Sequence, residues 1–121
     1  MRVVVADDLL AVRSALALLL EHEVDLAVVA QAADAASLLQ AVIRGTPDVV
    51  MMDWELPGAP ASEMVQTLRE IQPGLCIVAL SSRPEAEIAA MLAGADAFIY
   101  KGNPPTTVLE TLDRLTPRDA E

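Results

Sequence analysis

The polar residues of this sequence that could do chemistry each stand directly after a short apolar run. They are Asp7 and Asp8, Asp53, Ser81, and Lys101. Three carboxylates that converged within a few ångström would repel one another strongly and would need a cation among them. Carboxylate oxygens with no histidine or cysteine nearby favour Mg²⁺ or Mn²⁺, with several waters retained. The spacing therefore indicates an acidic metal pocket, provided that the first and third apolar runs lie side by side.

A lysine and a hydroxyl beside such a pocket would suit it to a phosphoryl group. Lys101 offers a positive charge and Ser81 offers a hydrogen-bond donor. One of the carboxylates could attack phosphorus and carry an acyl phosphate. Taken singly, these residues also have ordinary roles, since Asp8 could cap a helix and Asp53 could open a turn. Their joint occurrence at the ends of apolar runs favours a functional site.

Alternating apolar runs and helical patterns indicate the elements that position these residues. The runs are too short for buried helices and are continuous, as in strands covered on both faces; they span 3–6, 26–30, 49–52, 77–80 and 97–100. The segments after each run keep apolar residues at helical spacing, with Asp34 and Pro104-Pro105 at two helix starts and Gly45 at one helix end. Five such repeats predict an α/β fold: a five-stranded parallel sheet with helices on both faces and a ligand site beyond the carboxyl ends of its strands.

The composition narrows the classes of function. The 121 residues carry 8 Lys and Arg against 18 Asp and Glu, a formal net charge of -10, so we do not expect this domain to bind nucleic acid. One tryptophan, one tyrosine and one phenylalanine are too few for a base-stacking platform. The single cysteine, Cys76, lies in an apolar run and is expected to be buried in a reducing compartment. No run has membrane-spanning length, so we expect a cytoplasmic protein without a membrane partner.

The joint motif closely resembles the response-regulator receiver domain of two-component signalling, the CheY-like family. Its parts are Asp7-Asp8, Asp53 with Pro57 four residues on, Leu80-Ser81-Ser82, and Lys101 preceded by Ala93-Gly94-Ala95-Asp96-Ala97-Phe98. The resemblance covers nearly the whole chain, and the pattern is most similar to regulators of the NarL/LuxR type. It implies a flavodoxin-like, doubly wound sheet with strand order 2-1-3-4-5.

The resemblance also implies how a phosphoryl switch would work. Asp53 would be the phosphoacceptor, and Lys101 would pair with a phosphoryl oxygen. Ser81 would move towards the phosphoryl group and draw Phe98 inward. Phosphorylation would then shift the population between two arrangements, which differ at the face made by the fourth helix, the fifth strand and the fifth helix.

The implied metal site uses the same edge of the sheet. Asp8 and Asp53 would bind Mg²⁺ directly together with the backbone carbonyl of Glu55, and Asp7 would act mainly through water. Glu55 and Arg83 stand at positions that influence access of the attacking water in this family. We predict that they pair across the mouth of the pocket and slow hydrolysis, the alternative being two ordinary surface charges.

Two stretches depart from the usual family pattern. Ala61 stands where a glycine is common, which leaves the geometry of the preceding loop open, and Gly102 follows Lys101 where many receivers have proline. A glycine after this lysine also occurs in the NarL/LuxR type. We therefore do not expect Gly102 to abolish activity.

Expected partners follow from the resemblance and from the first helix. A sensor histidine kinase or a phosphotransfer protein would supply the phosphoryl group. Leu10, Ala17 and Leu18 broaden the apolar stripe of the first helix, which could dock a kinase helix or a second receiver in a homodimer, although Leu and Ala are also simply good helix formers. His22, near the end of this helix, is expected to interact with the helix dipole and not to donate a phosphoryl group.

We expect residues 1–115 to form the receiver domain and residues 116–121 to form a polar tail. The tail resembles the start of a helix-turn-helix output domain, which would couple the switch to transcription, but it could also be an ordinary helix end. Enzymatic activity beyond self-phosphorylation and autodephosphorylation is not expected.

Two other functions stay open. One is a degenerate receiver that serves as a phosphorylation-independent adaptor. The other is a phosphatase of the haloacid-dehalogenase kind, which would need two aspartates one residue apart after the first strand. Asp7-Asp8-Leu9 does not provide that spacing.

Overall fold

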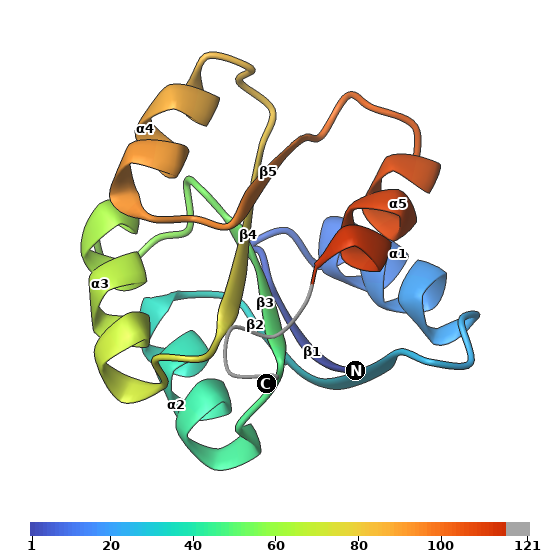
Figure 1. Ribbon diagram of the computed structural model, residues 1–121, viewed down its shortest axis with the longest axis horizontal. Coiled ribbons are helices and arrows are strands. Elements are labelled where there is room, and N and C mark those ends of the chain that lie inside the picture. The colour runs from blue at the N-terminus through green and yellow to red at the C-terminus, as the bar shows by residue number, and fades with distance from the viewer. Residues whose placement is uncertain (116–121) are drawn as a thin grey trace.

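Five parallel strands form one sheet in the computed structural model, which describes residues 1–115 (Figure 1). The strands are β1 (Arg2–Ala6), β2 (Ala27–Ala32), β3 (Val49–Asp53), β4 (Cys76–Ser81) and β5 (Ala97–Tyr100). The helices are α1 (Leu10–Glu21), α2 (Ala35–Gly45), α3 (Ala61–Ile71), α4 (Ala86–Ala93) and α5 (Thr106–Arg114). The sheet order is β2-β1-β3-β4-β5, which confirms the predicted topology and makes β1 and β3 neighbours.

The helices cover the sheet on both faces, with α1 and α5 on one face and α2, α3 and α4 on the other (Figure 1). Successive side chains of a strand point to opposite faces, so β3 contributes to both cores. Val50 and Met52 pack beneath α2 and α3, and Val49 and Met51 pack beneath α1 and α5. All four are fully buried. Burial of a side chain of this size contributes about 1.5–3 kcal/mol, so the central strands are held firmly between the helix layers.

The edge strand β2 differs from the central strands in its burial. In β3 and β4 every residue is buried, as predicted for strands covered on both faces. In β2 only Ala32 is buried, and Ala27 and Gln31 are exposed. Both faces of β2 are covered only in part, since Val29 and Ala30 pack on the core beneath α2 and Val28 packs on the core beneath α1. The physical reason is that β2 lies at the sheet edge and pairs with β1 alone.

The helix starts show which aspartates act as caps. Asp34 caps α2, because its carboxylate accepts the N–H of Ser37 at 2.8 Å in a capping box. The expected alternative role of Asp8 as the cap of the first helix is wrong, since α1 is preceded by Leu9 and has no side-chain cap. The carboxylate of Asp7 instead accepts the Leu9 N–H at 2.9 Å, which fixes the turn that leads into α1.

The loop from β3 to α3 lies against the start of α2. Gly58 has a φ of +109°, and a Cβ atom at this position would lie 3.1 Å from the Cβ of Ala35. The carbonyl of Pro57 accepts the N–H of Ala35 at 2.9 Å. Glycine is required here both by the positive φ and by the close approach, so this loop has a defined path. The loop ends at Ala61, which is the first residue of α3.

Other expectations concern the cysteine, membrane segments and the tail. Cys76 is buried at the start of β4, as predicted. Among residues 1–115, no helix has the length and apolar character needed to cross a membrane. The predicted polar tail, 116–121, lies outside the described residues.

Candidate functional site

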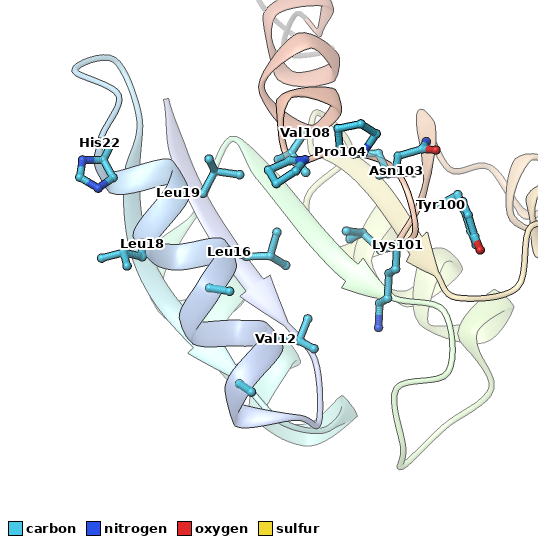
Figure 2. Close-up of a pocket in the computed structure, with 15 residues that line it drawn as sticks. Val12, Leu16, Leu18, Leu19, His22, Tyr100, Lys101, Asn103, Pro104 and Val108 are labelled. Carbon is cyan, nitrogen blue, oxygen red and sulfur yellow. The ribbon is translucent and has the colours of Figure 1, made fainter.

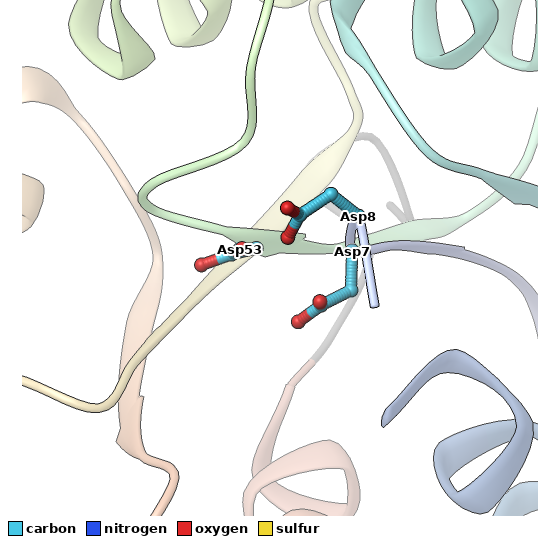
Figure 3. Close-up of side chains that lie close together, drawn as sticks. All are labelled: Asp7, Asp8 and Asp53. Carbon is cyan, nitrogen blue, oxygen red and sulfur yellow. The ribbon is translucent and has the colours of Figure 1, made fainter. Parts of the chain in front are cut away.

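Three aspartates meet at the carboxyl edge of the sheet, where the sequence predicted a pocket. Ala6 at the end of β1 pairs in register with Met52 of β3, so Asp7 and Asp53 follow side by side. Each of Asp7, Asp8 and Asp53 offers a carboxylate oxygen within 4.8 Å of those of the others (Figure 3). Asp7 and Asp53 are buried, whereas Asp8 is exposed and forms the open side of the cluster.

Lys101 brings a positive charge to this cluster from the end of β5. Its Nζ lies 2.6 Å from Oδ2 of Asp7 and 3.3 Å from Oδ1 of Asp53. The backbone N–H of Lys101 donates to the carbonyl of Ser81 at 2.8 Å, which ties the end of β5 to the end of β4. Burial opposes the charged ammonium, but the hydrogen bond to Asp7 and the charges of Asp53 and Asp7 outweigh it and raise the pKa of Lys101. Lys101 is therefore held as a cation between two carboxylates.

The surroundings of Asp53 disfavour its ionised form. Burial raises the pKa of Asp53 and the nearby charge of Asp7 adds to this, while the N–H of Glu55 and the ammonium of Lys101 act in the opposite direction. The Glu55 N–H donates to Oδ1 at 3.1 Å. Oδ1 thus faces both donors, whereas Oδ2 takes no hydrogen bond from any of the described residues. Oδ2 is therefore the oxygen of Asp53 that both donors leave unbound.

The donor set of the cluster fits a hard divalent cation. Three carboxylates and one lysine leave two negative charges when all are ionised, and the described residues contribute no histidine or cysteine to the cluster. Both oxygens of Asp7 already accept, from the Leu9 N–H and from Lys101. Asp8, in contrast, accepts no hydrogen bond from residues 1–115. Oxygen ligands and an uncompensated double negative charge suit Mg²⁺ or Mn²⁺.

A second polar cluster joins the loops after β3 and β4. The hydroxyl of Ser81 donates to the carboxylate of Glu55, with Oγ 3.0 and 3.1 Å from the two carboxylate oxygens. The backbone N–H of Arg83 donates to the same Oγ at 3.0 Å. The guanidinium of Arg83 pairs with Glu55 at 2.9 Å, which is the pairing expected from the sequence. The bond between Ser81 and Glu55 was not predicted, although the in-register pairing of Asp53 with Leu80 places the two loops side by side.

The aromatic residues near the site pack on a small alanine cluster. Phe98 of β5 and Trp54, which follows Asp53, are both half-buried against Ala79, Ala90 and Ala95. Phe98 therefore contacts the region between β4 and α4. The inward movement predicted for Phe98 stays a prediction, because a single arrangement is described.

Arg13 is a basic residue near the site that the sequence analysis missed. Its Nη1 donates to the backbone carbonyl of Asp7 at 2.8 Å. This contact ties α1 to the end of β1. Arg13 stands six residues after Asp7 and about one helical turn into α1, and this position was the available signal.

An apolar groove of about 600 Å³ lies beside the site, between α1 and the start of α5 (Figure 2). The stem of Lys101 lines the groove, and its ammonium reaches the acidic cluster. Leu18 also lines the groove and is 62% exposed, while Leu10 is 65% exposed.

Ala17 of α1 is buried, so its expected place in an outward apolar stripe is wrong and it belongs to the core under α1. His22 is the C-cap residue of α1, directly after Glu21, which agrees with its predicted place at the end of this helix.

Comparisons with known proteins agree with this geometry. The sequence model of the family described as response regulator receiver domain matches residues 3–113. An uncharacterized transcriptional regulatory protein of Bacillus subtilis, YhcZ, is 30% identical over 113 residues, which are 92% of this chain and 53% of YhcZ. The chain spans about half the length of the curated relatives it matches.

Solved structures show the same fold. A LuxR-family two-component response regulator from Aurantimonas sp. SI85-9A1 is similar with a TM-score of 0.86 and 29% identity, over 93% of this chain and 81% of that chain. The response regulator domain of Thermotoga maritima CheB is similar with a TM-score of 0.84 and 26% identity, over 97% of this chain and 98% of that chain.

Proposed function

Because this chain belongs to the response regulator receiver domain family of two-component signalling, we propose that it is a switch operated by phosphorylation of Asp53. The observation that carries the proposal is the position of Lys101, whose Nζ lies 2.6 Å from Asp7 and 3.3 Å from Asp53 within a cluster of three carboxylates. An acidic cluster that contains a lysine and still has negative charge to bind a divalent cation is suited to phosphoryl transfer.

In the proposed transfer, Oδ2 of Asp53 attacks the phosphorus of a phosphohistidine on a sensor histidine kinase or phosphotransfer protein. A P–O bond forms as the P–N bond breaks, and the electron pair of the P–N bond stays on the imidazole. The other ring nitrogen of the phosphohistidine carries a proton, so the imidazole that departs is neutral. Mg²⁺ or Mn²⁺ bound by Asp8, Asp53 and the Glu55 carbonyl, with Asp7 acting through water, would offset charge on the phosphoryl oxygens.

The chain's own residues would then respond to the new acyl phosphate. Lys101, already beside Asp53, exchanges a carboxylate contact for a phosphoryl oxygen. Ser81 turns its hydroxyl towards the phosphoryl group, and Phe98 follows into the space between β4 and α4. The face made by α4, β5 and α5 changes accordingly, as a shift between two populations.

The deciding experiment is intact-mass measurement after incubation with acetyl phosphate and Mg²⁺. The expected result is a gain of one phosphoryl group that requires Mg²⁺ and is lost in Asp53→Asn. No gain with acetyl phosphate or with a cognate kinase would refute the switch and would favour a phosphorylation-independent adaptor.

We propose that the ion pair of Glu55 and Arg83 covers the mouth of the pocket and slows hydrolysis of the acyl phosphate. Both side chains are partly exposed, so the pair itself adds little to stability. Its effect is expected in the approach of water. Arg83→Ala should shorten the acyl-phosphate lifetime, and an unchanged lifetime would show that the pair does not restrict water.

The kinase is proposed to dock on α1, next to the site. Leu10 and Leu18 are exposed there, and Leu18 lines the groove that reaches Lys101. Polar substitution of both leucines should slow transfer from the kinase without affecting phosphorylation by acetyl phosphate. Unchanged transfer from the kinase would remove this docking role.

The output of the switch is proposed to be transcription. This rests on relatives such as YhcZ, which is named a transcriptional regulatory protein and is about twice as long as the aligned segment. In this proposal residues 1–115 are the receiver domain, and 116–121 begin the link to an output domain.

A further inference from the structure

We propose that Glu55 is a positioning residue that holds the Ser81 hydroxyl in the unphosphorylated state, so that a phosphoryl group on Asp53 must take this hydroxyl from Glu55. The proposal rests on the proposed function and adds a competing partner within the chain. Its basis is the contact of Ser81 Oγ with both carboxylate oxygens of Glu55, at 3.0 and 3.1 Å.

The chemistry of a hydroxyl makes this contact exclusive. Ser81 has one hydroxyl hydrogen and is fully buried, so solvent offers it no alternative acceptor. A bond from a hydroxyl to a carboxylate is charge-assisted and stronger than a bond between neutral groups. While Glu55 accepts that hydrogen, a phosphoryl oxygen cannot. Switching therefore includes the cost of breaking the bond to Glu55.

The cluster is closed by a third member, Arg83. The Arg83 backbone N–H donates to Ser81 Oγ at 3.0 Å, and the Arg83 guanidinium holds Glu55 at 2.9 Å. Glu55 belongs to the loop after β3, and Ser81 and Arg83 belong to the end of β4 and the loop that follows it. The three residues thus clip the two loops together. A rearrangement of the loop after β4 has to open this clip.

Charge gives the phosphoryl group a means of opening the clip. A phosphoryl dianion on Asp53, two residues from Glu55, would repel the Glu55 carboxylate while attracting the Ser81 hydroxyl. Glu55 and Arg83 have side chains that are 39% and 54% exposed, so the pair has room to shift away from Ser81 while it stays at the mouth of the pocket. Phosphorylation would thereby remove Glu55, the acceptor that competes with the phosphoryl group for the Ser81 hydroxyl.

The clip can be tested first in the unphosphorylated protein, by hydrogen exchange at the Arg83 amide. Glu55→Ala removes the acceptor of Ser81, which frees Oγ to turn away from the Arg83 N–H. Exchange of this amide should become at least about threefold faster. Glu85→Ala is the matched control, since Glu85 is an acid 4.0 Å from the Arg83 guanidinium with no bond to Ser81. Unchanged exchange in Glu55→Ala would overturn the proposal, whether or not Asp53 accepts a phosphoryl group.

The competition is tested by binding of beryllofluoride with Mg²⁺, followed by the fluorescence of Trp54, the only tryptophan. Glu55→Ala should bind this phosphoryl analogue about ten- to a hundredfold more tightly than the wild type, the range for losing one competing hydrogen bond to a charged group. Glu55→Gln, which keeps an oxygen acceptor, should give a smaller gain. Glu85→Ala should bind like the wild type.

A double-mutant cycle separates the hydrogen bond from the simple loss of a negative charge. In a Ser81→Ala background, Glu55→Ala should no longer tighten beryllofluoride binding, because the hydroxyl over which the two acceptors compete is gone. The same gain in both backgrounds would show that Glu55 acts only through its charge and would overturn the proposal. Failure of the proposed function is distinguished by a wild-type chain that binds no beryllofluoride at all.

Discussion

Removing the charge of Asp8 is expected to stabilise the metal-free protein. Asp7 and Asp53 share the ammonium of Lys101, whereas Asp8 stands within 4.8 Å of both carboxylates without a cation of its own among the described residues. Asp8→Asn keeps the size of the side chain and removes its repulsion with two neighbours. It also removes a proposed ligand of Mg²⁺, so the same variant should lose stabilisation by the metal.

The expected size follows from the separation of the charges. Two unit charges 4.8 Å apart repel by about 0.9 kcal/mol in bulk water and by about 3.5 kcal/mol at the effective dielectric near a protein surface. Two such repulsions act on Asp8, and the ammonium of Lys101, which lies beside Asp7 and Asp53, offsets part of them. Because Asp8 is exposed, solvent screens the remainder towards the lower figure. We expect a gain of about 1–2 kcal/mol, which raises Tm by roughly 4–8 °C in a domain of this size.

Thermal unfolding followed by circular dichroism in EDTA at low salt is the direct assay. The gain should shrink at about 1 M salt, where charges are screened within about 3 Å. Mg²⁺ at a concentration of about a hundred times its Kd should stabilise the wild type by about 2.7 kcal/mol and raise its Tm accordingly. The Tm of Asp8→Asn should not respond to Mg²⁺. Asp25→Asn, an exposed aspartate in the loop after α1, is the control and should leave Tm nearly unchanged. An Asp8→Asn protein that melts at or below the wild-type temperature in EDTA would refute this account of the charges.

Three further predictions concern stability. Arg69→Ala should cost about 2–4 kcal/mol in urea unfolding, because its guanidinium binds two backbone carbonyls and pairs with the largely buried Asp96 at 2.7 Å; a cost below about 1 kcal/mol would contradict this. Burial raises the pKa of Asp53 above its ordinary value of 3.8, so in the absence of metal the folded state loses stability as pH rises from 3.8 through the raised pKa. The stability that Asp53→Asn gains over the wild type should therefore grow over this pH range. A constant difference between pH 3 and pH 7 would argue against this effect of burial. Gly58→Ala should lower the urea midpoint by the equivalent of about 1–3 kcal/mol, because the φ of Gly58 is +109°. Gly45→Ala in α2 is the control and should leave the midpoint unchanged or raise it. Equal changes of the midpoint in the two variants would disprove the strain at position 58.

The arrangement of the sheet could be predicted because local pattern and topology agree. The continuous apolar runs at β3 and β4 reflect strands buried on both faces, which leave little room for polar residues. The run at β2 is equally apolar although β2 lies at the edge of the sheet. A segment of four or five residues does not indicate whether its strand is central or at the edge. Asp34 could be identified as a cap from its place before a helical pattern. Asp8 had the same local context, but α1 begins one residue later than such a cap requires, with Leu9 at the N-cap position.

The site could be predicted as a set of residues but not as a set of bonds. The register of parallel strands brings Asp7, Asp53 and Lys101 together once the strand order is known, since all follow strand ends. The partner of Ser81 could not be foreseen, because Glu55 is 26 residues away and its carboxylate could also have faced solvent. Rotamers of long exposed side chains are decided by neighbours in space. Arg13 was missed for the same reason.

The pair of Lys101 and Asp7 joins residues 94 positions apart, nearly the whole length of the domain. A chain growing from the ribosome holds Asp7, Asp8 and Asp53 long before it holds Lys101, so its acidic edge has no internal counter-charge until β5 has emerged and added to the sheet. Contacts of such high contact order form late in folding. A nascent or partly unfolded chain therefore lacks the complete pocket. In the proposed function, only a chain whose entire domain has folded could accept the phosphoryl group.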